Sequence, residues 1–249
     1  MKINKIHYIL IVISAAIISC FMGCGKKNMV QYIRYEKLDN GTYYVKELTD
    51  AGKDASEITI PSEYEGIKVT AIGRGAFQDS PNLKAVHIAD SVTSILENAF
   101  LHCSGLETIE LPESTVELIG ANAFEGTKWQ NDILADKGAV IVGSIYVNGK
   151  QTSGEYTIPD GIKTIAAEAF KDNKNITKVV IPEGVKTLGL YSFSSCENLE
   201  RVDIPESLEK IGYGAFSYCS NLSIVIPKTV KNIDNDAFLD IKELEYQEG

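Results

Sequence analysis

Residues 199–221 read Leu199-Glu-Arg-Val-Asp-Ile-Pro-Glu-Ser-Leu-Glu-Lys-Ile-Gly-Tyr-Gly-Ala-Phe-Ser-Tyr-Cys-Ser-Asn221, and variants of this stretch recur along most of the chain. The recurrence is easiest to follow on phenylalanine. Phe77, Phe100, Phe124, Phe170, Phe193, Phe216 and Phe238 lie 23, 24, 46, 23, 23 and 22 residues apart, and the interval of 46 equals two periods. Self-similarity at a fixed period of this size is typical of stacked repeats. We therefore expect one elongated domain of about seven turns.

Each copy combines two short apolar segments with a turn. In the copy quoted above, residues 199–204 alternate like a strand, and Pro205 ends the strand because proline has no N–H to donate. Residues 208–211 form a second short apolar segment, and Gly212 is expected to permit the bend after it. Residues 215–219 fit a helical turn with Ala, Phe and Cys on its inward side. One copy cannot bury these side chains alone, so neighbouring copies must stack into a continuous core.

The pattern Ile-Pro-x-x-Val/Leu-x-x-Ile/Leu-Gly-x-x-Ala/Ser-Phe-x-x-Cys, seen in residues 181–196 and 204–219, resembles the leucine-rich repeat family. It is most similar to the 23-residue BspA-like type found in bacterial surface proteins, and the resemblance covers about residues 58–240. It implies a mostly β solenoid with short helical turns, and a non-catalytic surface module that binds proteins, for example in adhesion. The motif residues form the core, so they do not identify the ligand.

The segment before the first copy predicts a β-hairpin cap. Residues 32–46 contain two strand-like runs around Asn40-Gly41, a typical hairpin turn. Such a hairpin would cover the open edge of the first repeat. We assign residues 31–57 to this cap and residues 58–249 to the repeat domain.

A second departure lies between Phe124 and Phe170, where residues 133–150 replace a normal copy. Their alternation and their Gly and Asn turns predict a hairpin insertion, at about 128–152, that projects while keeping the phase of the repeats. Trp129 opens this insertion and is expected to anchor it by packing.

The N-terminus has the composition of a signal peptide. Lys2 and Lys5 precede an apolar run that ends at Gly23, and Cys24 follows directly. This arrangement resembles the lipobox of bacterial lipoproteins, in which the cysteine receives a diacylglyceryl group and the peptide is cut before it. Two acyl chains suffice for stable anchoring. We expect a signal peptide over residues 1–23, lipidation of Cys24, a tether over residues 24–30, and attachment to the extracellular face of the bacterial membrane.

Alternatives remain for this segment. Cys20, after Ile17-Ile18-Ser19, also fits a lipobox, and Phe21 departs from the small aliphatic residue usual three positions before the lipidated cysteine. The 20 uncharged residues between Lys5 and Lys26 would also suffice for an uncleaved membrane anchor, since about 20 span a bilayer. Simple secretion is the third possibility. All three place the remainder outside the cytoplasmic membrane.

Composition argues against several functions. The chain carries 34 Asp+Glu and 24 Lys+Arg, a net charge of −10, so nucleic acid is not an expected partner. Five cysteines and three histidines are too few for a disulfide scaffold or extensive metal chemistry. Neither His87 nor His102 lies in a zinc-binding pattern, and the chain has no nucleophile elbow or phosphate-binding loop. We therefore expect no enzymatic activity, no cofactor and no metal.

The remaining cysteines share one repeat position. Cys103, Cys196 and Cys219 each lie three residues after a phenylalanine, which favours a buried, small apolar role. Cys196 and Cys219 would stack within disulfide range, but their inward orientation favours free thiols.

A binding surface is expected on the first strand of each copy, if these strands form the concave sheet. Its outward positions form one column of Glu57, Ala85, Thr108, Glu155, Lys178, Arg201 and Ser223, and a second of Thr59, His87, Glu110, Thr157, Val180, Asp203 and Val225. Lys178, Arg201 and Asp203, in adjacent turns, form the best polar cluster and are the predicted ligand-binding residues. The expected partner of this monomer is a protein, a host-matrix component or a glycan. A lipoprotein that captures glycans or peptides for uptake is the alternative, and it would require a pocket or an aromatic platform.

Overall fold

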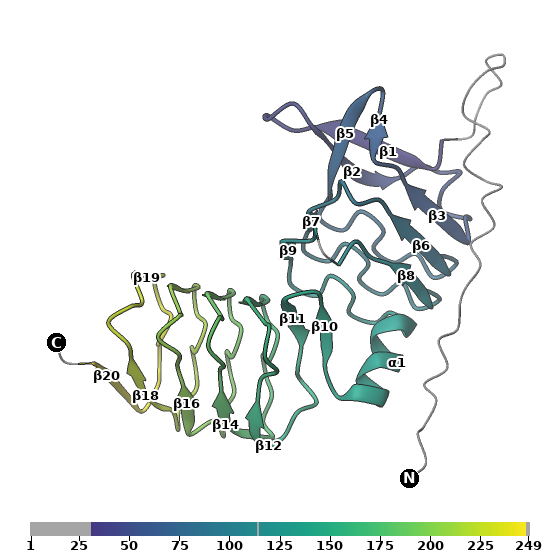
Figure 1. Ribbon diagram of the computed structural model, residues 1–249. Helices are drawn as coiled ribbons and strands as arrows, with labels where there is room; N and C mark the ends of the chain where they lie inside the picture. The colour runs from purple at the N-terminus through teal and green to yellow at the C-terminus, as the bar shows by residue number, and fades with distance from the viewer. Residues whose placement is uncertain (1–30, 114, 248–249) are drawn as a thin grey trace, which may run out of the picture. The chain divides into compact units, whose positions relative to one another are not determined.

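The computed structural model describes residues 31–113 and 115–247 (Figure 1). The predicted signal peptide, the tether and the two candidate lipidation residues, Cys20 and Cys24, lie outside the described residues. Among those residues, no helix is both long and apolar enough to cross a bilayer.

The strands form four sheets, two on each side of a single insertion. Before it, one sheet holds β1 (Ile33–Lys37), β2 (Tyr43–Leu48), β5 (Ile67–Ile72), β7 (Ser94–Ile95) and β9 (Leu118–Ile119), with β4 (Glu63–Tyr64) paired to β5. The other holds β3 (Glu57–Ile60), β6 (Ala85–Ile88) and β8 (Thr108–Glu110). After it, one sheet holds β10 (Val140–Val142), β11 (Ile145–Asn148), β13 (Thr164–Ile165), β15 (Thr187–Leu188), β17 (Lys210–Ile211) and β19 (Asn232–Ile233). The last holds β12 (Gly154–Thr157), β14 (Ile176–Val180), β16 (Arg201–Asp203), β18 (Ser223–Ile226) and β20 (Glu243–Tyr246).

Successive turns pair in parallel at a register of one repeat. Val179 lies opposite Val202 between β14 and β16, and Leu188 lies opposite Ile211 between β15 and β17. Figure 1 shows β12, β14, β16, β18 and β20 in this order along one side of the repeats. The predicted mostly β solenoid of leucine-rich-repeat type is confirmed, with about nine turns instead of seven. The additional turns lack the phenylalanine by which the copies were counted.

The core contains stacked phenylalanine rings, one from each regular turn. Phe170 and Phe193 lie 4.7 Å apart between ring centroids, and Phe193 and Phe216 lie 5.2 Å apart, with ring planes within 9° of parallel. Phe77, Phe100 and Phe124 stack in the same way before the insertion. These six rings are almost fully buried, which explains why the sequence keeps phenylalanine at a fixed period.

The backbone around each phenylalanine forms a further ladder, called here the Phe ladder. In the turn of Phe193, the N–H groups of Tyr191, Phe193 and Ser195 donate to carbonyls of the next turn at 2.8–2.9 Å. Tyr191 and Ser195 have φ values of 53° and 58°, and the residues two before and two after Phe77, Phe100, Phe124, Phe170, Phe216 and Phe238 also have positive φ. In the segment predicted as a helical turn, residues with a left-handed backbone conformation (positive φ) thus alternate with residues of negative φ. This alternation directs all three N–H groups toward the next turn.

Gly212 has a different role from the one predicted. Its φ is not positive, so the bend does not require glycine. A Cβ at this position would lie 2.9 Å from the carbonyl carbon of Gly189 and 3.0 Å from the oxygen of Leu188. Gly212 is therefore required because its backbone approaches the preceding turn too closely for a side chain.

The predicted N-terminal hairpin is present. Strands β1 and β2 pair antiparallel around Gly41, whose φ is 87°. Strand β2 then pairs in parallel with β5 of the first repeat. The hairpin therefore covers an edge that an uncapped repeat would expose.

The insertion differs from the prediction in two respects. Residues Lys128–Lys137 form a helix, α1, and the hairpin is confined to β10 and β11. The Thr127 hydroxyl accepts a hydrogen bond from the N–H of Gln130 at 3.1 Å, and Gly138 ends the helix at a φ of 72°.

The hairpin also belongs to the core instead of projecting from it. All four residues of β11 are buried, and β11 pairs in parallel with β13. Ile145 and Val147 pack in the core cluster before the insertion, whereas Tyr146 packs in the cluster after it. Trp129 packs on Phe124 with ring centroids 5.0 Å apart, as its expected packing role predicts.

Candidate functional site

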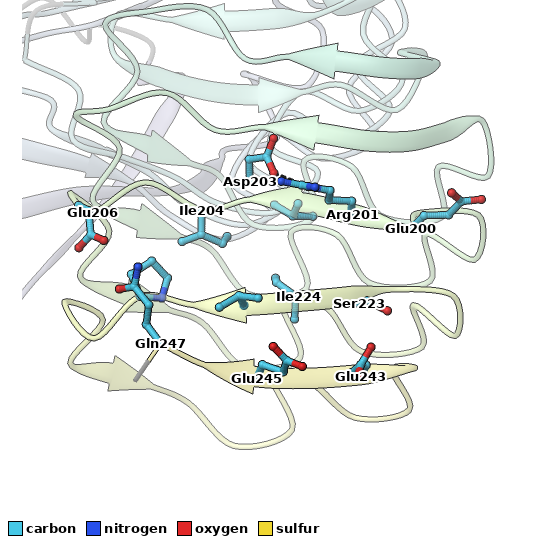
Figure 2. Close-up of a pocket in the computed structure, with 13 residues that line it drawn as sticks. Glu200, Arg201, Asp203, Ile204, Glu206, Ser223, Ile224, Glu243, Glu245 and Gln247 are labelled. Atoms are coloured by element: carbon cyan, nitrogen blue, oxygen red, sulfur yellow. Dashed lines mark hydrogen bonds and ion pairs between the residues drawn. The ribbon is translucent and has the colours of Figure 1, made fainter. Parts of the chain in front are cut away.

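The outer face of the sheet β12–β14–β16–β18–β20 contains a hollow of about 490 Å³, called here the acidic hollow. Its charged lining consists of Glu200, Arg201, Asp203, Glu206, Glu243 and Glu245. Figure 2 shows Glu243 and Glu245 on the last strand and Arg201 turned along its own strand toward Asp203. Five carboxylates and one guanidinium make this part of the sheet strongly anionic, so it favours a cationic partner.

The structure brings the three predicted ligand-binding residues together. The Arg201 Nε donates to Asp203 Oδ1 at 2.6 Å, and the Lys178 Nζ lies 3.7 Å from Asp203 Oδ2. Lys178 also lies 3.6 Å from Glu155 Oε2. Arg201 and Asp203 line the acidic hollow, whereas Lys178 lies outside its lining. Ion pairs at this exposure contribute little to stability, so a ligand could exchange with them at small cost.

Glu243 and Glu245 also lie on this face, although the sequence did not predict them there. Strand β20 aligns Glu243 with Ser223 and Glu245 with Val225, so the two carboxylates extend the two outward columns by one turn. Residues 242–249 contain neither the proline nor the phenylalanine that marks the register of the other copies. The alternation Glu243-Leu-Glu-Tyr246 is the only signal of this strand, and it is too short to stand out without the preceding turns.

The corresponding face before the insertion holds a charged triplet. The His87 Nδ1 lies 2.7 Å from Glu110 Oε2, and its Nε2 lies 3.0 Å from Glu57 Oε1. The hydrogen bond to Glu110 raises the pKa of His87, and the charge of Glu57 adds to the effect. The His87 side chain is 31% exposed, in agreement with the predicted surface position.

The three cysteines in the described part of the chain are free and buried, as expected. Each thiol donates to the carbonyl of a phenylalanine in the preceding turn, for example Cys103 to Phe77 at 2.9 Å and Cys219 to Phe193 at 3.0 Å. Burial raises the pKa of Cys103 to about 11. A hydrogen bond to Cys219, together with burial, raises the pKa of Cys196. The thiols of Cys103 and Cys196 are therefore held protonated, and all three thiols satisfy backbone carbonyls.

Metal binding finds no support in this geometry. Across residues 31–113 and 115–247, no group of three or more His, Cys, Asp or Glu side chains is placed to hold a metal ion.

Comparisons with known proteins agree with the repeat architecture. The family model described as BspA type Leucine rich repeat region matches residues 19–146 and 119–245, with six copies. Among curated proteins, none matches the chain significantly.

Solved structures with similar folds are bacterial leucine-rich repeat proteins. One from Bacteroides ovatus is 29% identical, with a TM-score of 0.42 over 87% of this chain and 52% of that protein. The chain thus spans about half the length of the Bacteroides protein. One from T. pallidum is 21% identical, with a TM-score of 0.44 over 89% of this chain and 86% of that one. A leucine-rich cell surface protein from Faecalibacterium prausnitzii is 17% identical, with a TM-score of 0.39 over 89% of this chain and 94% of that one.

Proposed function

Because this chain belongs to the BspA-type leucine-rich repeat family, we propose that it is a non-catalytic, protein-binding module attached by a lipid to the bacterial cell surface. The observation that carries this proposal is the open face of the sheet β12–β14–β16–β18–β20, which runs uninterrupted over five turns and includes the acidic hollow. Such a face suits a macromolecular partner, since small-molecule sites are enclosed mainly by apolar side chains.

The polar cluster at the centre of this face is the proposed contact. Lys178 and Arg201 both reach Asp203, so the cluster offers cations and a carboxylate on two adjacent strands. Complementary charges of this kind set the rate and specificity of protein association more than its affinity. Adhesion to a host-matrix or bacterial-surface protein is the use that we propose for this surface.

A capture experiment tests this assignment. The full chain, displayed on cells, is incubated with extracts of host matrix, glycans and bacterial surfaces, and bound material is identified. The double variant Lys178→Ala/Arg201→Ala is expected to lose capture of a partner that places an acidic group on these two cations, whereas a partner held only by the carboxylates of the acidic hollow would be captured more tightly and would exclude the cluster as the contact. The control Lys186→Ala/Lys210→Ala removes two lysines that also form ion pairs, with Glu209 and Asp234. Lys210 lies in β17 of the other sheet, and Lys186 directly precedes β15 of that sheet. Capture that is unaltered by the first variant would exclude the cluster, and loss with both variants would indicate a nonspecific effect of charge.

The lipid anchor is supported by Gly23-Cys24 at the boundary between the apolar run and Lys26-Lys27. Cells fed with a clickable fatty acid should label the wild-type chain, and Cys24→Ala should abolish the label. Label that survives Cys24→Ala and disappears with Cys20→Ala would transfer the assignment to Cys20. Absence of label on the wild type would contradict lipid anchoring while leaving the binding proposal intact.

The acidic hollow also supports the alternative of a lipoprotein that captures substrates for uptake, because its volume of about 490 Å³ is that of typical ligand sites. Calorimetric titration with short oligosaccharides and oligopeptides distinguishes the two functions. Tight binding of a small ligand would favour uptake, and binding only to intact proteins favours the surface module.

A further inference from the structure

The outer face of the sheet β3–β6–β8 has a histidine at its centre, between two carboxylates. His87 lies on the middle strand (Figure 1), with its Nδ1 2.7 Å from Glu110 Oε2 on β8 and its Nε2 3.0 Å from Glu57 Oε1 on β3. The other outward side chains of the three strands carry no charge, and they are those of Thr59, Ala85 and Thr108. Glu57 and Glu110 are therefore the charged groups of this sheet that face His87.

The two contacts of His87 define its protonation state in this arrangement. An ionised carboxylate only accepts hydrogen bonds, whereas a neutral imidazole has one N–H and one nitrogen with a lone pair. Both ring nitrogens of His87 can therefore donate only when the ring is an imidazolium, in agreement with its raised pKa. Loss of the proton turns a lone pair toward one of the carboxylates, so that contact must break.

The proton on His87 controls whether the two carboxylates are available to a partner. The side chains of Glu57 and Glu110 are 66% and 67% exposed, so both are accessible from the solvent. With the proton, one positive charge lies between two negative charges, and both carboxylates are engaged. Without the proton, the two carboxylates flank a neutral aromatic ring. Histidine makes this change near neutral pH, since its unperturbed pKa is about 6.5.

The sheet β12–β14–β16–β18–β20 contains the same arrangement with a permanent cation. Lys178 on β14 lies between Glu155 on β12 and Asp203 on β16, with its Nζ 3.6 Å and 3.7 Å from their carboxylate oxygens. A lysine ammonium ordinarily stays charged at physiological pH, since its unperturbed pKa is about 10.4. His87 takes the place of this lysine, on a strand between two carboxylate-bearing neighbours. Of the two faces, only that of β3–β6–β8 therefore loses its central cation as the pH rises.

We propose that the outer face of β3–β6–β8 binds a basic segment of another protein, whose arginine or lysine side chains pair with Glu57 and Glu110 when His87 is neutral and are excluded when His87 is protonated. The cation of the partner and the proton on His87 compete for the same two carboxylates. Arginine is favoured, because its planar guanidinium also stacks on the neutral imidazole ring. This surface is separate from the polar cluster of the proposed function, so it extends that function and does not depend on it.

The probe that tests this is a fluorescent hexa-arginine peptide, titrated into the full chain by anisotropy at several pH values. Carboxylates with ordinary pKa values stay ionised between about pH 5.5 and about pH 8.5, so peptide contacts elsewhere on this acidic chain add a nearly constant affinity. Release of one proton makes the affinity rise by up to about tenfold per pH unit below the pKa of His87 and become constant above it. We expect about tenfold tighter binding at about pH 8.5 than at about pH 5.5. Equal affinity at the two pH values, or tighter binding at the lower one, would overturn the proposal.

Substitutions of His87 separate this contact from the general charge of the chain. His87→Gln is neutral at every pH, so its affinity should stay at the high-pH level of the wild type. His87→Lys keeps a cation between the carboxylates and should stay at the low-pH level. The matched control His102→Gln removes another exposed histidine, which lies 3.1 Å from Asp79, and should keep the pH dependence. A pH dependence that survives unchanged in His87→Gln would overturn the assignment.

The peptide should in turn change the titration of His87. Because coupling between two binding events is reciprocal, the bound cations should lower the pKa of His87. Nuclear magnetic resonance titration at saturating peptide should show this decrease for His87 and not for His102. In Glu57→Gln/Glu110→Gln the peptide should no longer move the pKa of His87. An unmoved pKa in the wild type would exclude the competition.

One further variant separates this inference from the proposed function. Lys178→Ala/Arg201→Ala changes the polar cluster on the other face and should keep the pH dependence of peptide binding. Loss of the pH dependence in this variant would overturn the assignment to the face of β3–β6–β8. If the capture experiment fails while the peptide binds with the expected dependence on His87, the proposed function falls and this inference stands.

Discussion

Tyr146 stacks on Phe170 with their ring centroids 4.9 Å apart and their planes within 11° of parallel. The ring thereby begins the aromatic stack that continues through Phe193, Phe216 and Phe238. Its hydroxyl lies 3.0 Å from the hydroxyl of Tyr156, so the one polar atom of this buried side chain has a partner. Tyr146 is thus the point at which the repeat core resumes after α1.

Two substitutions of Tyr146 should separate the contribution of its ring to stability from that of its hydroxyl. We expect Tyr146→Ala to lower the free energy of unfolding by about 3–5 kcal/mol, because the variant leaves a cavity in the core. Tyr146→Phe should cost only about 0.5–1.5 kcal/mol, the net value of one hydrogen bond. Urea unfolding followed by circular dichroism measures both. If both variants lowered the free energy of unfolding equally, the stacked ring would make no contribution to stability beyond that of the hydroxyl.

Phe193 provides the same test within a regular turn. It is fully buried between Phe170 and Phe216, and Phe193→Ala should destabilise the fold by about 3–5 kcal/mol. Leu190→Ala is the control, since Leu190 is 49% exposed in the same turn and its loss should cost under about 1 kcal/mol. Nearly unchanged melting of the Phe193 variant would contradict the register of the repeats.

His87 should make stability depend on pH. Its pKa is raised in the folded state by Glu110 and Glu57, so its contribution is complete below the unfolded pKa of about 6.5 and is lost as the pH rises through the folded pKa. His87→Gln should therefore destabilise the fold more at about pH 5.5 than at about pH 8.5, by under about 1 kcal/mol because both carboxylates are exposed. Nuclear magnetic resonance titration gives a direct check. The pKa of His87 should fall in Glu110→Gln, and a pKa unmoved by that substitution would exclude the contact.

The buried thiols should be unreactive in the folded protein. In a chain with Cys20 and Cys24 replaced by serine, a thiol reagent at neutral pH is expected to modify Cys103, Cys196 and Cys219 only after unfolding, because all three are buried and Cys103 and Cys196 have raised pKa values. Three thiols per chain should then react in denaturant. A count of one would indicate a disulfide between Cys196 and Cys219.

The periodic features of the fold could be predicted from the sequence because each has one dominant physical cause. A buried ring in every regular turn fixes the phenylalanine period, and the Asn40-Gly41 turn identifies the capping hairpin. Turns without a buried phenylalanine were not included in the predicted number of seven, which explains the difference from about nine. The backbone of Tyr146 aligns with Ile165, and only its ring joins the stack of phenylalanines, so the sequence period does not reveal its role. The helix α1 was not predicted, although Thr127 and Gly138 carry the capping signals of a helix.

The candidate site was predictable only in part. Lys178, Arg201 and Asp203 could be placed together because they share one register of the repeats, and the structure joins them through Asp203. Glu243 and Glu245 could not be placed, because the residues around β20 lack the proline and the phenylalanine of the repeat, and their alignment depends on the pairing with β18. The acidic hollow arises from the side chains of three strands together and has no signature in any one of them.

The Phe ladder has a consequence for how such chains change length in evolution. Every regular turn presents backbone N–H donors to the turn on one side and carbonyl acceptors to the turn on the other. For example, the N–H of Phe193 donates to the carbonyl of Ala215, and the N–H of Phe216 donates to the carbonyl of Ala237. Duplication or deletion of one whole copy therefore rejoins a donor side to an acceptor side and preserves every contact of the neighbouring copies. Gains or losses of part of a copy break this match. Lineages of this fold can therefore change the number of turns, and with it the length of the exposed sheets, in steps of one repeat while each remaining copy is unchanged.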